Sequence, residues 1–132
     1  MTKYSQDGTK VWTKLLGTSG SDTAYSITTG IDGSIYIAGT TAGSLDGKIN
    51  SGDTDGFLVK YAPDGSKIWT ELIDTSSEDT ARFVAAGPDG SIYVTGYTEG
   101  QLNGQSVIGA DIYITKLDFP RCSRQLGSMI SS

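Results

Sequence analysis

The amino-acid sequence predicts an all-β protein built from a repeated four-stranded antiparallel unit. The sequence repeats itself after 57 residues, with 25 identities between residues 3–52 and 60–109. Its short apolar segments are rich in β-branched and aromatic residues and are separated by Asp-Gly pairs or glycine-rich breaks, as in strands joined by hairpins. Glycine makes up 18 of the 132 residues, roughly twice its ordinary share, which indicates many tight turns.

The predicted strands occupy equivalent positions in the two units. They cover residues 25–30, 34–39, 56–61 and 67–73 in the first unit, and residues 82–86, 91–96 and 111–117 in the second. One further strand is expected at residues 10–16. Asp-Gly pairs at residues 32–33, 64–65 and 89–90 lie between neighbouring strands, where a tight hairpin turn needs residues that tolerate positive φ.

A four-stranded antiparallel unit that recurs every 40 to 60 residues or so is typical of a β-propeller blade. If the strands of a blade are named a to d from the axis outward, the chain contains c and d, then a to d, then a to c. Residues 1–118 are therefore expected to form two propeller repeats, at about residues 3–59 and 60–118. Residues 119–132 depart from the repeat and are expected to form a disordered tail.

Two segments of the chain resemble a known family. They are residues 55–70 (DGFLVKYAPDGSKIWT) and residues 89–98 (DGSIYVTGYT). These segments resemble the bacterial β-propeller repeats called SBBP repeats, and the resemblance extends over about residues 3–118. Members of that family are generally surface or secreted proteins without assigned chemistry. The resemblance therefore implies a propeller fold and an extracellular or cell-surface location.

The number of repeats predicts an oligomer, because a closed propeller has at least about four blades. The second repeat lacks its outer strand, which residues 10–16 of a neighbouring copy could supply. We therefore expect a head-to-tail homo-oligomeric ring closed by strand exchange, with a trimer favoured over a tetramer. The alternative is that the chain is one piece of a longer propeller.

Composition argues against several classes of function. The chain has no histidine, which excludes hydrolases, proteases and zinc sites that use an imidazole. Cys122 is the one cysteine and cannot form an intrachain disulfide. A net charge of −5 argues against a nucleic-acid partner. No apolar segment approaches the roughly 18 residues of a membrane-spanning helix, and the first residues lack a signal-peptide core.

The long connections are the predicted binding surface, since loops on a rigid scaffold commonly carry binding. They hold nine of the fifteen acidic residues but only Lys48 of the ten basic ones, and cover residues 17–24, 41–55, 74–81 and 98–111. The chain is therefore expected to be a non-catalytic binding or scaffold module with an acidic face. The candidate binding residues are Asp22, Asp46, Asp79, Glu99 and Asn103.

Two of these acids have a structural alternative. Asp22 and Asp79 occupy equivalent positions before a strand, where an Asp side chain often binds nearby backbone amides. No cofactor is expected apart from a candidate Ca²⁺ site, because Ca²⁺ prefers carboxylate and carbonyl oxygens. Its candidate ligands are Asp53, Asp55 and Asp111.

Aromatic residues recur at equivalent places in the two repeats. We interpret Trp12, Trp69, Tyr36 and Tyr93 as packing between neighbouring blades. The alternative is a lectin, in which these rings stack on sugars and one weak site per blade gains avidity from repetition. A glycosidase would need a pair of carboxylates. No spacing selects two from Glu71, Glu78, Asp79 and Glu99, so an enzyme is not expected.

Overall fold

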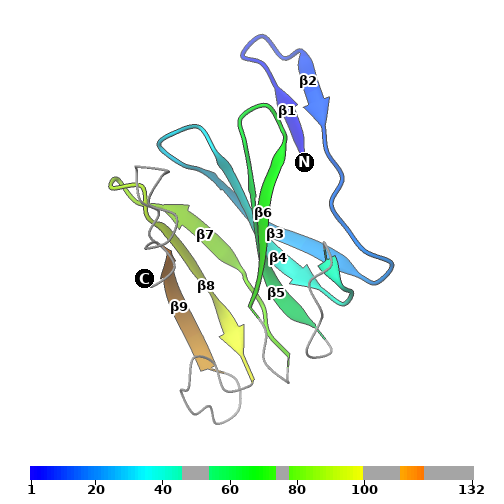
Figure 1. Cartoon of the computed structure of the whole chain (residues 1–132), viewed down its shortest axis with the longest axis vertical. Coiled ribbons are helices and arrows are strands. Elements are labelled where there is room, and N and C mark those ends of the chain that lie inside the picture. The colour runs from blue at the N-terminus through cyan, green and yellow to red at the C-terminus, as the bar shows by residue number, and fades with distance from the viewer. Residues whose placement is uncertain (46–53, 74–77, 100–110, 118–132) are drawn as a thin grey trace.

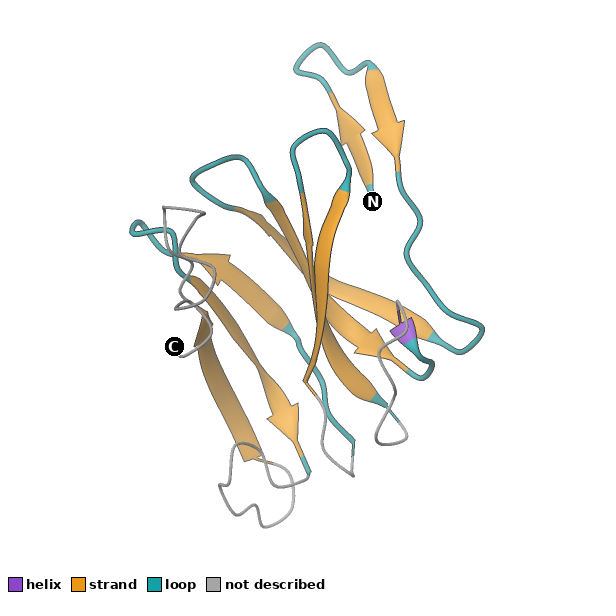
Figure 2. Cartoon of the chain, in the orientation of Figure 1, coloured by secondary structure: helices purple, strands orange, loops and turns teal. Residues whose placement is uncertain are grey.

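The computed structural model of the chain describes residues 1–45, 54–73, 78–99 and 111–117. These residues form strands and connections, with one short 3-10 stretch at Leu45 (Figure 2). The prediction of an all-β, antiparallel fold is confirmed. The strands are β1 (Thr2–Tyr4), β2 (Lys10–Thr13), β3 (Asp22–Thr29), β4 (Ile35–Thr41), β5 (Asp55–Tyr61), β6 (Lys67–Ile73), β7 (Phe83–Ala86), β8 (Ile92–Thr98) and β9 (Asp111–Leu117).

The strands make three sheets in which each strand pairs with its neighbours in sequence. We call them the N-terminal hairpin (β1-β2), the central sheet (β3-β4-β5-β6) and the C-terminal sheet (β7-β8-β9). Figure 1 shows the tight hairpin turns at one end of the strands and, at the other end, the strand ends from which the longer connections leave. Each of the four turns has a glycine with φ between 85° and 92°, a conformation that side chains with a Cβ rarely adopt: Gly8, Gly33, Gly65 and Gly90.

The N-terminal hairpin reproduces the outer half of the central sheet. Thr2 lies opposite Thr13 and Lys3 opposite Trp12. In the central sheet, β5 and β6 pair their counterparts in the same register, Val59 with Thr70 and Lys60 with Trp69. The sequence repeat is therefore also a repeat of backbone pairing.

The core consists of two clusters that lie on opposite faces of the central sheet. Alternate residues of a strand point to opposite faces, so Tyr36, Ala38 and Leu58 pack against the C-terminal sheet. Ile37 and Phe57 point the other way and belong to the cluster that Met1, Trp12 and Leu16 cover from the N-terminal side. Both faces of the central sheet are thus covered, and every residue of β4 is buried.

Two strand ends differ by three residues from the predicted ones, and several others differ by one or two residues. The strand predicted at residues 10–16 ends at Thr13, because its short partner β1 offers no pairing beyond a mutual backbone contact between Met1 and Lys14. The strand predicted to begin at residue 25 begins at Asp22, because the partner strand β4 continues to Thr41 and pairs with it. Strand length is set here by the partner rather than by the residues of the strand itself.

Within the described residues, no helix is long and apolar enough to cross a membrane. The predicted tail at residues 119–132 lies outside the described residues.

Candidate functional site

The tight-turn end of the molecule uses its aspartates for turn formation. In each turn an Asp carboxylate accepts a hydrogen bond from the backbone N–H two residues later, as Asp64 does from Ser66 at 2.9 Å. Asp7, Asp32 and Asp89 accept equivalent bonds at 3.0 Å. Hydrogen bonds to the charged form hold the pKa of these carboxyls below the ordinary value, and the Ser5 hydroxyl contributes most at Asp7, lowering its pKa to about 2.

At the opposite end, Asp22 fixes the base of a long connection. Its carboxylate accepts hydrogen bonds from the backbone N–H of Thr18 at 2.7 Å and from the Thr41 hydroxyl at 2.6 Å. The Thr41 oxygen in turn accepts the N–H of Gly43 at 3.1 Å. Burial alone would raise the pKa of the Asp22 carboxyl, but the bonds from Thr41 and Thr18 outweigh it and the pKa is lowered.

Asp79 is in the equivalent position in the C-terminal sheet. It is fully buried, and its carboxylate accepts the hydroxyl of Thr98, the counterpart of Thr41, at 2.5 Å. Its backbone N–H donates to the Thr54 carbonyl at 2.8 Å, which ties this sheet to the end of the central sheet. Asp22-Thr41 and Asp79-Thr98 are therefore one feature that occurs twice, and we call it the Asp-Thr lock.

Beside each Asp-Thr lock, a glycine allows a backbone carbonyl, that of Thr23 or Thr80, to approach closely. A Cβ at Gly39 would lie 2.0 Å from the Thr23 carbonyl oxygen, and a Cβ at Gly96 would lie 2.1 Å from that of Thr80. The Tyr113 hydroxyl also donates to the Thr80 carbonyl at 2.6 Å. Burial, followed by the charge of Asp79, raises the pKa of Tyr113.

Three further acids lie at the long-connection end. The Glu78 carboxylate accepts the Tyr97 hydroxyl at 2.7 Å, and this bond is the main cause of the raised pKa of Tyr97. Glu99 and Asp111 are exposed. Of the predicted binding residues, Glu99 is therefore open to solvent, Asp22 is partly buried and Asp79 is fully buried. Asp46 and Asn103 lie outside the described residues.

The candidate Ca²⁺ ligands are separated among the sheets. Asp55 is fully buried at the start of β5, whereas Asp111 is exposed at the start of β9 in a different sheet. Asp53 lies outside the described residues. No three Cys, Asp or Glu side chains come together as possible metal ligands in the part of the chain that the structure describes.

The recurring aromatic residues lie between sheets to different degrees. Tyr36 and Trp69 belong to the cluster between the central and C-terminal sheets, with ring centroids 6.2 Å apart and planes inclined by 55°. Trp12 packs from the N-terminal hairpin onto the other face of the central sheet. Tyr93, the counterpart of Tyr36, is partly exposed, and the Lys116 ammonium lies 5.9 Å from its ring centroid.

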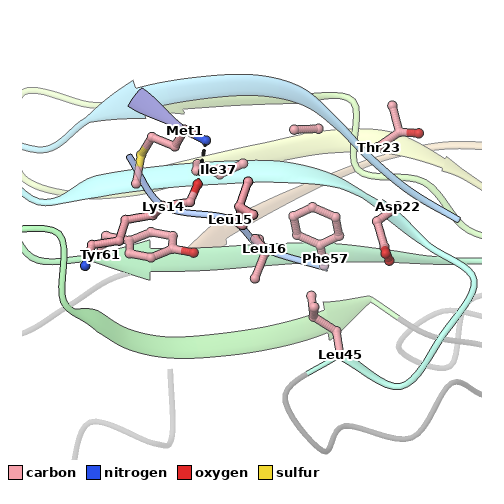
Figure 3. A pocket seen from close by; sticks show the side chains of 11 residues that line it. Met1, Lys14, Leu15, Leu16, Asp22, Thr23, Ile37, Leu45, Phe57 and Tyr61 are labelled. Carbon is pink, nitrogen blue, oxygen red and sulfur yellow. Dashed lines mark hydrogen bonds between the residues drawn. The ribbon is translucent and has the colours of Figure 1, made fainter. Parts of the chain in front are cut away.

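A cavity of about 160 Å³ lies between the segment after β2 and the central sheet. Figure 3 shows Tyr61 and Met1 at one end of the cavity, Phe57 and Leu16 in the middle, and Asp22 at the other end. The Met1 ammonium donates to the Lys14 carbonyl at 2.8 Å beside it. The lining is mostly apolar, and the one carboxylate in it belongs to the Asp-Thr lock.

Sequence reasoning missed the partners in the lock. Thr41 and Thr98 are among the identities between the repeats, as are Gly39 and Gly96, so a search for polar identities beside Asp22 and Asp79 would have found them. Tyr113 could not be found in this way, because its counterpart in the first repeat is a phenylalanine without a hydroxyl.

Comparison with known proteins places the sequence among repeat proteins. Residues 11–46 match the model of the SBBP family, described as a beta-propeller repeat. Over 117 residues, or 83% of the chain, the sequence is 30% identical to the regulatory protein FlaEY of Caulobacter vibrioides. Over 61 residues, or 46% of the chain, it is 41% identical to an uncharacterised WD repeat-containing protein of Acanthamoeba polyphaga mimivirus. The matched regions span 12% and 4% of the length of these relatives.

Proposed function

Because this chain carries a β-propeller repeat of the SBBP family at residues 11–46, we propose that it is a non-catalytic module that binds another protein. The matches to a regulatory protein and to a WD repeat-containing protein support a role in protein interaction. The absence of histidine from the sequence supports a function without acid–base catalysis by an imidazole.

The observation that carries the proposal is the repeated Asp-Thr lock. Asp22-Thr41 and Asp79-Thr98 fix the points where long connections leave the central and C-terminal sheets. A binding surface made of loops needs such fixed bases, since affinity falls when loops must be ordered on binding. The turns at the other end are short and use their aspartates internally. We therefore assign partner binding to the long-connection end.

The partner has a basic surface. The long connections hold nine of the fifteen acidic residues and one of the ten basic residues. Asp55 and Asp79 are buried and add little to a surface potential, but Glu99 and Asp111 are exposed there. Charge complementarity of this kind raises association rates and selects partners of opposite sign.

We further propose that the module is a homo-oligomer, with a trimer favoured and β2 of one copy completing the C-terminal sheet of the next. Among the described residues, the C-terminal sheet has three strands and the central sheet has four, and β9 is the last strand of the C-terminal sheet. A head-to-tail contact repeated by rotation closes such units into a ring. Light scattering during size-exclusion chromatography should give the mass of three chains.

The binding proposal is tested by titrating the full chain with a lysine- and arginine-rich peptide in a calorimeter. Glu99→Gln and Asp111→Asn should each weaken binding by about twofold to fivefold, the range of an exposed ion pair. Glu71→Gln is the matched control, because Glu71 is an exposed acid within strand β6 and not in a long connection. Equal losses of affinity in all three variants would show non-specific attraction and overturn the assignment. Binding of a glycan without any binding of the peptide would also overturn it.

A further inference from the structure

The C-terminal sheet exposes an apolar face whose counterpart in the central sheet is buried. Phe83, Thr95 and Ile114 lie opposite one another in the register of this sheet, so their side chains share a face, together with Tyr93 and Ile112. The opposite face, with Val84 and Val94, packs on the central sheet. Large side chains are therefore left exposed on one face only: Phe83, Tyr93, Ile112 and Ile114.

The sequence repeat identifies what covers the equivalent face in the central sheet. Leu58 is 1% exposed and Tyr36 is 3% exposed, because both pack on Val84, Ile92 and Val94 of the next sheet. Their counterparts Ile114 and Tyr93 are 76% and 38% exposed. The face that covers Leu58 and Tyr36 belongs to another repeat, and so an equivalent repeat fits the face of Ile114 and Tyr93.

At the other end of the molecule, the central sheet has an apolar face that is only partly covered. Ile27, Ile35 and Ile37 are the counterparts of Val84, Ile92 and Val94. Val84 is 6% exposed, but Ile27 is 58% exposed, because the N-terminal hairpin covers only part of this face of the central sheet. A second cavity, of about 340 Å³, lies between the hairpin and Ile27 and Ile35.

One substitution between the repeats is matched by free space. Gly56 passes close to the backbone of Thr80 and Ala81, where a Cβ would lie 2.9 Å away. Its counterpart on the exposed face is the larger Ile112. The counterparts of Thr80 and Ala81 are Thr23 and Ala24, and both line the cavity of about 160 Å³. The face of Ile27, Ile35 and Ile37 thus has a cavity at the position where the face of Ile114 carries the bulkier Ile112.

We propose that the face formed by Phe83, Tyr93, Ile112 and Ile114 docks on a second copy of this chain, on the face formed by Ile27, Ile35 and Ile37. There, β9 of the first copy displaces β1 of the second copy from β2. This inference rests on the proposed homo-oligomer and names its interface. Residues 115–117 of β9 correspond to Val59, Lys60 and Tyr61, and so do Thr2, Lys3 and Tyr4 of β1. Both segments therefore fit the same edge of β2. Within one chain β1 pairs with this edge, and β9 of a second copy replaces it on association.

The competition predicts opposite effects of two sets of variants on the dissociation constant measured by sedimentation of the full chain. Ile114→Asp and Ile27→Asp should each weaken association by at least about tenfold. Lys3→Pro should strengthen it, because a proline in the middle of β1 cannot donate a ladder hydrogen bond to β2. The controls are Ile31→Asp, at an exposed isoleucine in the β3–β4 turn, and Lys3→Ala, which keeps the backbone donor.

A cross-link tests the contact independently of these affinities. In a Cys122→Ser background, Ile27→Cys and Phe83→Cys together should give disulfides between chains. At the equivalent contact within the chain, the Val84 backbone N–H donates to the Ser26 hydroxyl at 3.3 Å. Cross-linked multimers on a non-reducing gel support the interface. A chain that associates but is unaffected by Ile27→Asp and Ile114→Asp overturns it while leaving the homo-oligomer intact. Monomers of both the wild type and Lys3→Pro at all concentrations would overturn the homo-oligomer itself.

Discussion

At the scale of single residues, burial separates two aspartates that the sequence treats as equivalent. Asp22 and Asp79 both accept a threonine hydroxyl, but Asp79 is fully buried and Asp22 lies at the edge of a cavity. A buried carboxylate cannot recover a lost hydrogen bond from water. The second lock should therefore contribute more to stability than the first.

Replacing Thr98 with valine removes the hydroxyl that donates to Asp79 and keeps the shape of the side chain. We expect Thr98→Val to lower the free energy of unfolding by about 1–3 kcal/mol, the cost of a weakened buried polar contact. The equivalent Thr41→Val should cost less. Urea denaturation of both variants measures this, with Thr29→Val on β3 as an exposed control. A larger loss for Thr41→Val would contradict the role of burial.

The tyrosine at the interface between the central and C-terminal sheets, Tyr36, makes the free energy of unfolding fall at high pH. Burial, followed by the charge of Asp32, raises the pKa of Tyr36 from 10.0 to about 12. A raised pKa means that the unfolded chain ionises first, so the stability that this group contributes is complete below pH 10 and is lost as pH rises towards 12. Urea midpoints measured across this range should fall, and Tyr36→Phe should reduce the fall. An identical pH profile for the variant would contradict the assignment.

At the scale of strands and sheets, the sequence predicts the order and centre of β2 to β9 but not their ends, and it predicts no range for β1. The Asp-Gly turns and the β-branched and aromatic residues of Ile35–Thr41 are local signals. Where β2 and β3 end or begin depends on the length of β1 and β4, which is a property of the partner. For the candidate site, Asp22 and Asp79 could be selected from the repeat. The contacts around Asp79 come from distant parts of the chain: its backbone N–H bonds to Thr54, just before β5, and the Tyr113 hydroxyl of β9 bonds to the carbonyl of the adjacent Thr80.

The close approach beside the locks can be tested at Gly96. A Cβ there would lie 2.1 Å from the Thr80 carbonyl oxygen, so the backbone must move to accept it. We expect Gly96→Ala to cost about 3 kcal/mol, at the upper end for overpacking. Gly8→Ala is the control, since it has no atom within 4 Å and meets only the cost of a positive φ, about 1 kcal/mol. Equal shifts of the thermal midpoint would contradict the steric explanation.

At the scale of the whole molecule, the central sheet is the layer on which the other two sheets depend. Its two faces contribute to both core clusters. The N-terminal hairpin contributes Trp12 of β2 and Met1, which directly precedes β1, to one cluster only. In a protein built from stacked repeats, stability decreases toward units with fewer neighbours. The hairpin should therefore open before the central sheet.

Hydrogen exchange measures this order directly. We expect the amides of β4 and β5 to exchange only through global unfolding, and those of β1 to exchange by local opening at least about tenfold faster. All residues of β4 are buried, whereas all residues of β1 are exposed. Trp12→Ala should accelerate exchange in the hairpin and leave β8 unchanged. Uniform protection across the sheets would show that the hairpin belongs to a single cooperative unit.

The shared register of the N-terminal hairpin and β5-β6 has a consequence for the gene. Lys3 pairs with Trp12 and Lys60 pairs with Trp69 in the same register. A chain that continues after Lys3 with the residues that follow Lys60 would therefore keep the same strand pairing. A recombination event between these positions removes or adds one unit of 57 codons. Each product keeps every remaining strand beside an equivalent neighbour, and so the number of units can change during evolution without a new fold having to arise.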